Sequence, residues 1–189
     1  MSRIESTMLP LGTAIPAFSL PDVVSGTTVT LDHFHGRTGL LVMFLCRHCP
    51  FVKHLDKALA ELGRDYADRP MGIVAISSND AEADPADAPA SLKQQAEDHG
   101  FVFPYLYDET QEVAREFRAA CTPDFFLFDH DLKLVYRGQF DASRPGNDIA
   151  ITGEDLRAAM DAVLAGKAAS SEQRPSVGCN IKWKQEVVG

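Results

Sequence analysis

The segment "FLCRHCPFVKH", residues 44–54, places Cys46 and Cys49 three positions apart, directly after a continuous apolar run. That run, "GLLVMFL" at 39–45, has the length and composition of a strand buried on both faces. Residues 49–66 then change to helical spacing, with Pro50 in the first turn, where its missing N–H group is harmless. The pattern predicts a strand that ends at a cysteine pair and a helix that begins there.

The flanking sequence predicts further strands and helices in alternation. The expected elements are strands within 17–31, a strand at 71–77, a helix at 89–99, an extended segment at 101–107, a helix opened by Asp108 and Gln111 and running through Phe117, a hairpin at 125–138, and a helix at 153–165 capped by Thr152. We therefore predict an α/β fold with a central mixed β-sheet flanked by helices. It forms one domain over residues 1–189, with an N-terminal β-hairpin and a C-terminal tail extension at 166–189.

Composition narrows the class of protein. The chain has 189 residues, of which 45% are apolar and 24% charged, enough for a full core without disulfide bonds. The net charge of -9 argues against a nucleic-acid partner, because phosphate binding needs clustered Lys and Arg. The start has no signal-peptide pattern, and "LLVMFL" (40–45) is too short to span a membrane. We expect a cytoplasmic protein, and there a close cysteine pair is more often catalytic or metal-binding than structural.

The position of the pair predicts an acidic thiol. A helix N-terminus offers unpaired N–H groups and a partial positive charge, which favour thiolate over thiol. Arg47 is cationic and His48 can be, and nearby positive charge stabilises a thiolate further. We expect Cys46 to be exposed at the strand end, with a pKa below the ordinary value of about 8.5, and Cys49 to be more buried. A stable thiolate also predicts an oxidising disulfide.

Two other interpretations of the pair stay open. Cys46 and Cys49 can be neighbouring thiols with no redox role. Alternatively, they can bind a metal together with His48 and His54, with Cys121 or Cys179 completing the site in space. A structural zinc site usually has a second ligand pair at regular spacing downstream, which this sequence lacks, so no metal or cofactor is part of the leading hypothesis.

The chain resembles the thioredoxin-fold proteins of the alkyl hydroperoxide reductase / thiol-specific antioxidant superfamily, in particular the branch described only as "thioredoxin family protein". The similarity covers nearly the whole chain. It is carried by "FLCRHCPFVKH", "ISSND", "FPYLYDETQEVA", "CTPDFFLFD", "YRGQFDASRPGN" and "PSVGCNIKW". The first and fourth of these segments match the two functional loops of any thioredoxin fold.

The resemblance implies a redox-active pair in which Cys46 attacks and Cys49 resolves the mixed disulfide, tuned by Arg47 and His48. It also implies a cis-proline at Pro123, with the Thr122 backbone available to pair with an extended substrate. The implied activity is thiol–disulfide oxidoreduction on a protein or small-molecule disulfide or dithiol. The sequence does not name the electron donor or the oligomeric state.

The chain departs from relatives in this superfamily at several positions. Peroxidase members carry Pro-x-x-x-Thr-x-x-Cys, where this chain has Gly39, Met43 and Cys46. A peroxiredoxin-like, antioxidant peroxide reductase is therefore the alternative, and we expect weak peroxidase activity at best. Thioredoxins have Trp before the first cysteine and a buried acid further back; here Leu45 stands at the former position, and 39–45 contains no acid. A copper or zinc carrier and a pure interaction module are the remaining hypotheses.

The tail "RPSVGCNIKWKQ", residues 174–185, has apolar side chains to bury. We predict that it folds back over the core, with Trp183 covering apolar surface. Cys121, two residues before Pro123, is expected near the redox face. If the tail docks on that face, Cys179 can pair with Cys121 or act as an extra resolving thiol. If it docks on the back of the sheet, Cys179 is a passive buried thiol.

Overall fold

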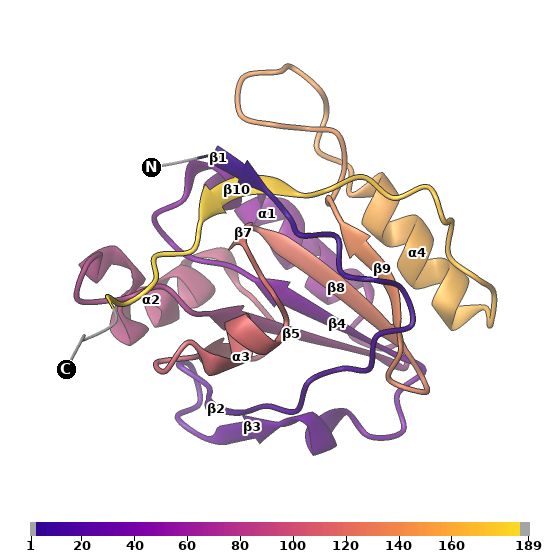
Figure 1. Ribbon diagram of the computed structural model, residues 1–189, viewed down its shortest axis with the longest axis horizontal. Helices are drawn as coiled ribbons and strands as arrows, with labels where there is room; N and C mark the ends of the chain where they lie inside the picture. The colour runs from indigo at the N-terminus through magenta and orange to yellow at the C-terminus, as the bar shows by residue number, and fades with distance from the viewer. Residues whose placement is uncertain (1–2, 186–189) are drawn as a thin grey trace.

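The computed structural model describes residues 3–185, and in this part of the chain five strands form the main sheet, in the order β6-β5-β4-β8-β9 (Figure 1). The central strand is β4 (Gly39–Phe44), which is buried along its whole length. It pairs in parallel with β5 (Met71–Ser77), which pairs in parallel with β6 (Tyr105–Tyr107). On its other side β4 pairs antiparallel with β8 (Asp124–Asp129), followed by β9 (Leu134–Gly138). The predicted mixed sheet is confirmed.

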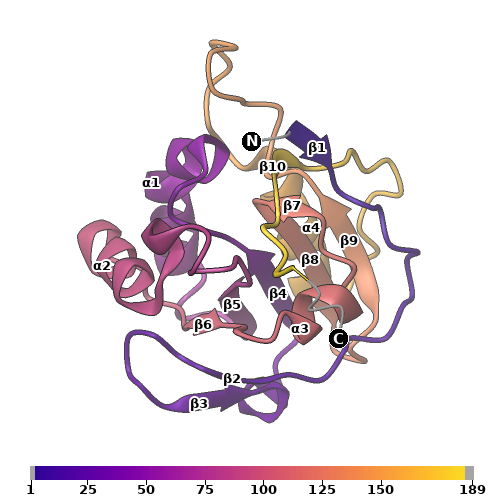
Figure 2. The same cartoon turned by 60° about the vertical axis from the view of Figure 1, so that its left-hand side comes forward.

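Helices α1 (Pro50–Asp65), α2 (Pro89–His99) and α4 (Glu154–Leu164) contribute to one hydrophobic core, on one face of the sheet. Successive side chains of a strand point to opposite faces, so Leu41 and Met43 of β4 pack into this core. The predicted positions of all three helices are confirmed within a residue or two. Figure 2 shows α1 and α2 together on one side of the sheet.

The opposite face carries a second core. Here the hairpin of β2 (Ser19–Pro21) and β3 (Thr28–Thr30) and the short helix α3 (Glu112–Glu116) cover the sheet. The aromatic rings of Phe44 and Phe117 pack edge to face, with centroids 5.4 Å apart. Such pairs contribute beyond their buried area. The short 3-10 helix η1 (Leu31–Phe34) follows β3 directly.

A small separate sheet holds the tail. In it β10 (Val177–Asn180) lies between β1 (Arg3–Glu5) and β7 (Cys121–Thr122), antiparallel to both (Figures 1 and 2). Cys179 is the partner of Thr122 in the register. The prediction that the tail folds back is therefore confirmed, although its sequence had no clear strand pattern. The division into one domain with an extension from residue 166 stays a prediction.

Three local predictions hold only in part. Trp183 is 38% exposed, so it covers less surface than predicted, and the Arg115 guanidinium lies 4.7 Å from its ring centroid. Asp108 caps the start of α3, since its carboxylate accepts from the Ala114 N–H at 2.9 Å, but the Gln111 side chain instead donates to the Ser78 carbonyl at 2.6 Å. The Thr152 hydroxyl accepts from the Glu154 N–H at 3.3 Å, but the N-cap residue of α4 is Gly153, at φ 67°, a conformation that glycine adopts without strain.

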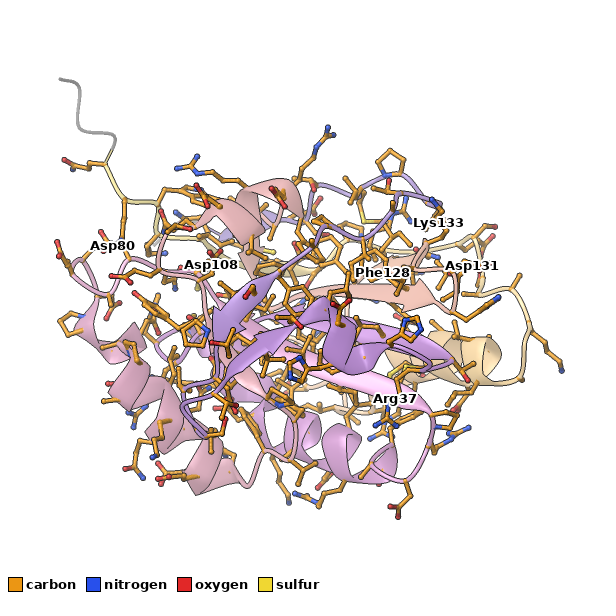
Figure 3. All side chains as sticks on the ribbon, turned by 90° about the horizontal axis from the view of Figure 1, so that it is seen from below. Arg37, Asp80, Asp108, Phe128, Asp131 and Lys133 are labelled. Carbon is orange, nitrogen blue, oxygen red and sulfur yellow. The ribbon has the colours of Figure 1, made fainter. Side chains whose placement is uncertain are left out.

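The two ends of the sheet differ in what they carry. Figure 3 shows Asp80 and Asp108, which follow β5 and β6, at the opposite end of the molecule from Asp131 and Lys133 in the β8–β9 turn. The cysteine pair follows β4 and so lies at the carboxyl end of the parallel strands, with Asp80 and Asp108. Among the residues that the structure describes, no helix is long and apolar enough to cross a membrane.

The close approach of β10 to β7 gives the first prediction. A Cβ atom on Gly178 would lie 2.0 Å from the Thr122 carbonyl oxygen, which is backbone and has little room to move. We expect Gly178→Ala to displace β10, to lower the free energy of unfolding by about 1–3 kcal/mol, and to accelerate alkylation of the buried thiols. The measurements are chemical denaturation and the rate of maleimide labelling.

Gly146→Ala is the control for this experiment. A Cβ atom there meets nothing within 4 Å, and its φ of +82° makes the strain local to an exposed loop. We expect its labelling rate to equal that of the wild type. Equal labelling of Gly178→Ala and wild type would contradict the role given to β10 in covering the thiols.

Candidate active site

Cys46 and Cys49 lie between the end of β4 and the start of α1. Cys49 is the N-cap residue of the helix, and Pro50 occupies the first helical position. The Cys49 carbonyl accepts hydrogen bonds from the N–H groups of Val52 and Lys53, at 3.1 and 3.0 Å. The predicted strand–Cys-x-x-Cys–helix arrangement is present, and the electrostatic field of the helix N-terminus acts on the pair.

Both thiols contact the loop that contains Pro123. The Cys46 sulfur is 3.1 Å from the Thr122 hydroxyl, and the Cys49 sulfur is 3.2 Å from the Thr122 carbonyl oxygen. The Thr122–Pro123 peptide bond is cis, as predicted. The structure thus brings together Cys46, Cys49, Thr122 and Pro123.

The expectation that the Thr122 backbone is open to a substrate is wrong in this state. Thr122 pairs with Cys179 of β10, so the chain's own tail occupies the neighbouring strand position. The expectation that Cys46 is exposed is also wrong, since Cys46 and Cys49 are both 0% exposed. The sequence did not show that the tail docks beside Thr122, so neither expectation took the tail into account.

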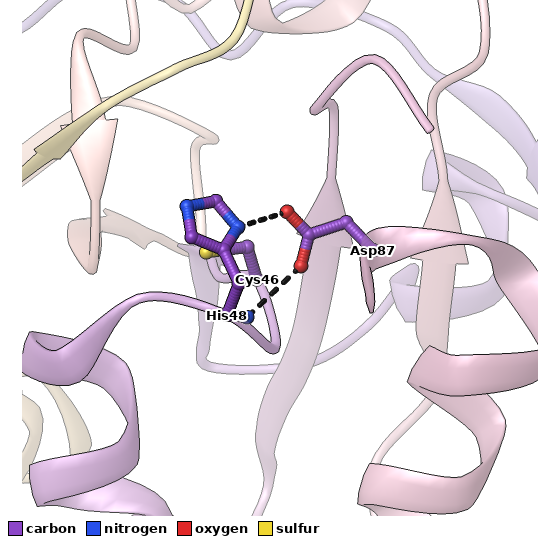
Figure 4. A group of neighbouring side chains, drawn as sticks. All are labelled: Cys46, His48 and Asp87. Carbon is purple, nitrogen blue, oxygen red and sulfur yellow. Dashed lines mark hydrogen bonds and ion pairs between the residues drawn. The ribbon is translucent and has the colours of Figure 1, made fainter. Parts of the chain in front are cut away.

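Arg47 and His48 share one hydrogen-bond partner, Asp87, at the end of the short helix η2 (Pro85–Asp87). Figure 4 shows the bonds from His48 to Asp87 beside Cys46. The main-chain N–H groups of Arg47 and His48 both donate to Asp87 Oδ1, at 2.7 and 3.1 Å. The His48 ring hydrogen-bonds through Nδ1 to Asp87 Oδ2, which also accepts from Asn79 at 2.7 Å. The Asp87 side chain is fully buried. One carboxylate therefore fixes the conformation of the whole Cys-Arg-His-Cys turn.

The pKa values of His48 and Asp87 move apart. The hydrogen bond to Asp87 raises the pKa of His48 and outweighs burial, which acts in the opposite direction. Burial acts to raise the pKa of Asp87, but the hydrogen bonds from His48 and Asn79 outweigh it and hold that pKa below its ordinary value. Both shifts favour the charged forms, an imidazolium at His48 and a carboxylate at Asp87.

The prediction that Arg47 and His48 make Cys46 acidic is wrong. Burial, the Cys49 thiol and the negative charge of Asp87 raise the pKa of Cys46, against the hydroxyl of Thr122. The positive charge of His48 is matched by Asp87, and the Arg47 guanidinium donates to the Ser91 carbonyl at 3.1 Å. Arg47 and His48 therefore stabilise the conformation of the turn and do not lower the pKa of Cys46.

Cys49 is the acidic thiol of the pair. The hydrogen bond from Cys46 is the largest cause, and together with the Cys179 thiol and the N–H groups of Val52 and Cys179 it outweighs burial and lowers the pKa of Cys49 to about 5. Each of these donors stabilises the anion. The negative charge that the sequence predicted for Cys46 therefore belongs to Cys49 in this conformation.

The remaining cysteines, Cys179 and Cys121, have different surroundings. The thiols of Cys179 and Cys49 are 2.7 Å apart. Cys121 also lies beside the redox face, as predicted, but its thiol donates to the Pro123 carbonyl at 3.6 Å, and burial raises its pKa. Its register partner on β10 is Asn180, so the considered pairing of Cys121 with Cys179 is not the one that the structure favours.

The side chains that lie close enough to bind a metal differ from the set that the sequence predicted. His54 lies 3.1 Å from the Ser143 hydroxyl, in the loop before α4, and is not part of the cluster. Within the described chain, the atoms of Cys46, His48 and Asp87 that can bind a metal lie within 4.8 Å of one another. The imidazole and the carboxylate are already hydrogen-bonded to each other, so this arrangement works as an ion pair beside a thiol.

Asp87 is the residue that sequence reasoning missed. It lies in the acidic segment "NDAEADPAD", 79–87, where nothing in the sequence distinguishes it from the other acids. A groove of about 590 Å³ lies beside α4, lined by Tyr136 and Arg174 among others, and no cysteine lines it.

The ion pair gives a prediction for pH dependence. The pKa of His48 is raised and that of Asp87 lowered on folding, so the pair's stabilisation is complete between the unfolded values of about 3.9 and about 6.5. It is lost as the pH rises through the folded pKa of His48 or falls through that of Asp87. Asp87→Asn removes the hydrogen-bonded carboxylate, so we expect the pKa of His48 to fall, measured by NMR titration of the ring protons.

Asp84→Asn is the matched control, because Asp84 lies 3.3 Å from the same ring nitrogen but is one-third exposed, at 33%. We expect a smaller decrease of the His48 pKa there. A His48 pKa that is unchanged in Asp87→Asn would show that the carboxylate does not hold the imidazolium.

The acidity of Cys49 gives a second prediction. Thiolate absorbance in the ultraviolet should appear with a midpoint at about pH 5 in the reduced protein and should be lost in Cys49→Ser. Cys46→Ala removes the main donor and should raise the midpoint. Cys121→Ser should leave it unchanged. A first thiolate that appears only near the ordinary cysteine pKa of about 8.5 would contradict the assignment.

Comparison with known proteins places this site in a family. The AhpC/TSA family matches residues 11–137. A solved structure from Geobacillus kaustophilus, described as an uncharacterized conserved protein, is 52% identical and covers 99% of both chains, with a TM-score of 0.97. A hypothetical protein of Sinorhizobium meliloti is 48% identical over 95% of this chain and 98% of its own, with a TM-score of 0.93.

More distant structures share the fold. The thioredoxin domain of a thiol-disulfide oxidoreductase from Bacteroides vulgatus is 21% identical, covers 68% of this chain and 88% of its own, and has a TM-score of 0.57. No curated protein matches the sequence. The match to the family over residues 11–137 agrees with the cysteine pair at a helix start and with the mixed sheet. The chain belongs to the AhpC/TSA family and has a thioredoxin-like fold.

Proposed function

We propose that the protein is a thiol–disulfide oxidoreductase whose redox centre is Cys46 and Cys49. The observation that carries the proposal is the pair itself. The two thiols hydrogen-bond to each other at the N-terminus of α1, and both contact Thr122. A cysteine pair in this position alternates between dithiol and disulfide with small movements, because α1 and β4 hold both residues.

The proposed reaction begins from the reduced pair. The Cys49 thiolate accepts the proton of Cys46, and the Cys46 sulfur attacks one sulfur of a substrate disulfide, so that the other substrate sulfur leaves as a thiolate. The first leaving thiolate takes up that proton from Cys49, and the Cys49 thiolate so restored attacks the Cys46 sulfur of the mixed disulfide and releases the second substrate thiolate. The protein loses two electrons and the substrate gains them, and the reverse sequence oxidises a dithiol.

The acidity of Cys49 supports these roles. A thiolate close to Cys46 is both a base for the attacking thiol and a ready resolving nucleophile. The Thr122 hydroxyl, 3.1 Å from Cys46, is placed to stabilise charge on that sulfur. Since Cys46 is fully buried, a substrate reaches it only after β10 moves away from β7. The proposed substrates are disulfides or dithiols of cytoplasmic proteins or small molecules.

Peroxide reduction is the less favoured activity. Gly39 and Met43 occupy the places of the proline and threonine of the peroxidase pattern, and Cys46 is a buried thiol with a raised pKa. A peroxidatic cysteine needs a thiolate that peroxide can reach. Consumption of hydrogen peroxide by the reduced protein should therefore be slow.

Turnover of oxidised glutathione and of a disulfide-bonded peptide, with dithiothreitol as the reductant, tests the proposal. We expect Cys46→Ser to slow turnover strongly, because the proposed attacking sulfur is lost. Incubated with the disulfide in the absence of dithiothreitol, Cys49→Ser should stop after the first step and accumulate a mixed disulfide at Cys46, visible by mass spectrometry. Cys121→Ser should retain activity. Turnover that survives the loss of both Cys46 and Cys49, or peroxide as the only oxidant consumed, would overturn the proposal.

A further inference from the structure

Cys49 lies between two other thiols. On one side it hydrogen-bonds to Cys46, and on the other its sulfur is 2.7 Å from that of Cys179, which is 130 residues further along the chain. A disulfide bond is about 2.0 Å long, so the sulfurs of Cys49 and Cys179 need only a small movement to bond. The contact exists because β10 pairs with β7 and places Cys179 opposite Thr122.

The position of Cys179 is fixed from both ends of β10. Before the strand, the Ser176 hydroxyl donates to the Pro123 carbonyl at 2.6 Å, and the Ser176 N–H donates to the Ser6 hydroxyl at 2.9 Å. After it, the Lys182 N–H donates to Asn79 at 2.8 Å, and the Asp80 N–H donates to the Lys182 carbonyl at 2.9 Å. The tail is therefore built into the site, and Cys179 is directed at Cys49.

We propose that Cys179 is a third redox thiol, which attacks the Cys49 sulfur of the Cys46–Cys49 disulfide and moves that disulfide to Cys49–Cys179. This step rests on the proposed function, which supplies the first disulfide. The bond between Cys179 and Cys49 forms as that between Cys46 and Cys49 breaks. Cys46 leaves as a thiolate and takes up the proton that Cys179 has lost. No electrons enter or leave the protein in this exchange.

The loss of negative charge on Cys49 in the first disulfide favours attack by Cys179. In the reduced protein burial and then the Cys49 sulfur raise the pKa of Cys179 to about 12. Once Cys49 is part of a disulfide it has no charge, so its share of this effect is lost and the Cys179 thiolate becomes more accessible. The leaving sulfur, Cys46, keeps the Thr122 hydroxyl at 3.1 Å as a hydrogen-bond donor.

The exchange has two consequences. Cys46 is again a thiol, but it stays buried and protected from a second disulfide while the first is stored at Cys49–Cys179. The stored disulfide also joins β10 covalently to the start of α1, so the tail remains docked over the site. A reductant that cleaves the Cys49–Cys179 disulfide reverses both consequences, since it frees β10 and restores the Cys49 thiol beside Cys46.

The sequence allows the two disulfides to be distinguished directly. Trypsin cuts after Arg37, Arg47, Lys53, Arg118, Lys133, Lys167 and Lys182, and Arg174 is protected by the following proline. Each cysteine therefore falls on a different peptide: Cys46 on 38–47, Cys49 on 48–53, Cys121 on 119–133 and Cys179 on 168–182. Every disulfide appears as one specific pair of linked peptides in a non-reducing digest.

The experiment treats the reduced full-length protein with one equivalent of oxidised glutathione, blocks remaining thiols with N-ethylmaleimide at intervals, and maps the links. In the wild type we expect the Cys46–Cys49 link first, followed by growth of Cys49–Cys179 and return of maleimide to Cys46. In Cys46→Ser we expect Cys49–Cys179 alone, formed through glutathionylated Cys49, with the mass of two hydrogen atoms lost from each chain.

Control variants distinguish failure of the third-thiol proposal from failure of the proposed function. Cys179→Ser should form Cys46–Cys49 and stop there, and Cys179→Ala repeats the test without a hydroxyl. Cys121→Ser should behave as the wild type. If the wild type forms only Cys46–Cys49, and Cys46→Ser stays glutathionylated without a Cys49–Cys179 link, the third-thiol proposal is wrong and the proposed function stands. If the wild type forms no Cys46–Cys49 link at any interval, the proposed function fails first.

Discussion

The antiparallel pairing of β10 with β7 is the contact on which the rest of the site depends. It pairs Cys179 and Asn180 of the tail with Thr122 and Cys121, and the absence of a side chain on Gly178 lets the backbones come this close. The same pairing brings the Cys179 sulfur to Cys49, and Cys46 and Cys49 are both fully buried in this arrangement.

Burial by the tail also decides where negative charge is stable. A thiolate in a dry site needs donors directed at it, because desolvation disfavours the charged form. Cys49 has such donors, from Cys46, Cys179 and main-chain N–H groups, whereas Cys46 has the Thr122 hydroxyl and lies near the carboxylate of Asp87. The charge therefore follows the hydrogen bonds of the folded site and not the basic residues next to the cysteines in the sequence.

The sequence was sufficient to predict those elements that the local pattern of residues determines. The continuous apolar run of 39–45 and the helical spacing after Pro50 were enough for β4, α1 and the cysteine pair between them. The partners of Arg47 and His48 were not predictable, because Asp87 reaches them from about 40 residues away in a segment of several similar acids. The role of the tail was missed in part for the same reason: strand β10 is short, has no alternating pattern, and is stable only on β7.

One strand thus has two opposed tasks. Substrate access to Cys46 requires β10 to leave Thr122, whereas contact between Cys179 and Cys49 requires it to stay. Each intramolecular hydrogen bond contributes about 0.5–1.5 kcal/mol net, so the β7 edge of the strand, with the Ser176 and Lys182 contacts, is held by a few such bonds, while β1 holds its other edge. An extended substrate with its own main-chain hydrogen bonds can therefore compete for the β7 edge. Once substrate leaves, the strand returns, and only then do all three sulfurs meet, so exchange with Cys179 follows substrate release and does not compete with it.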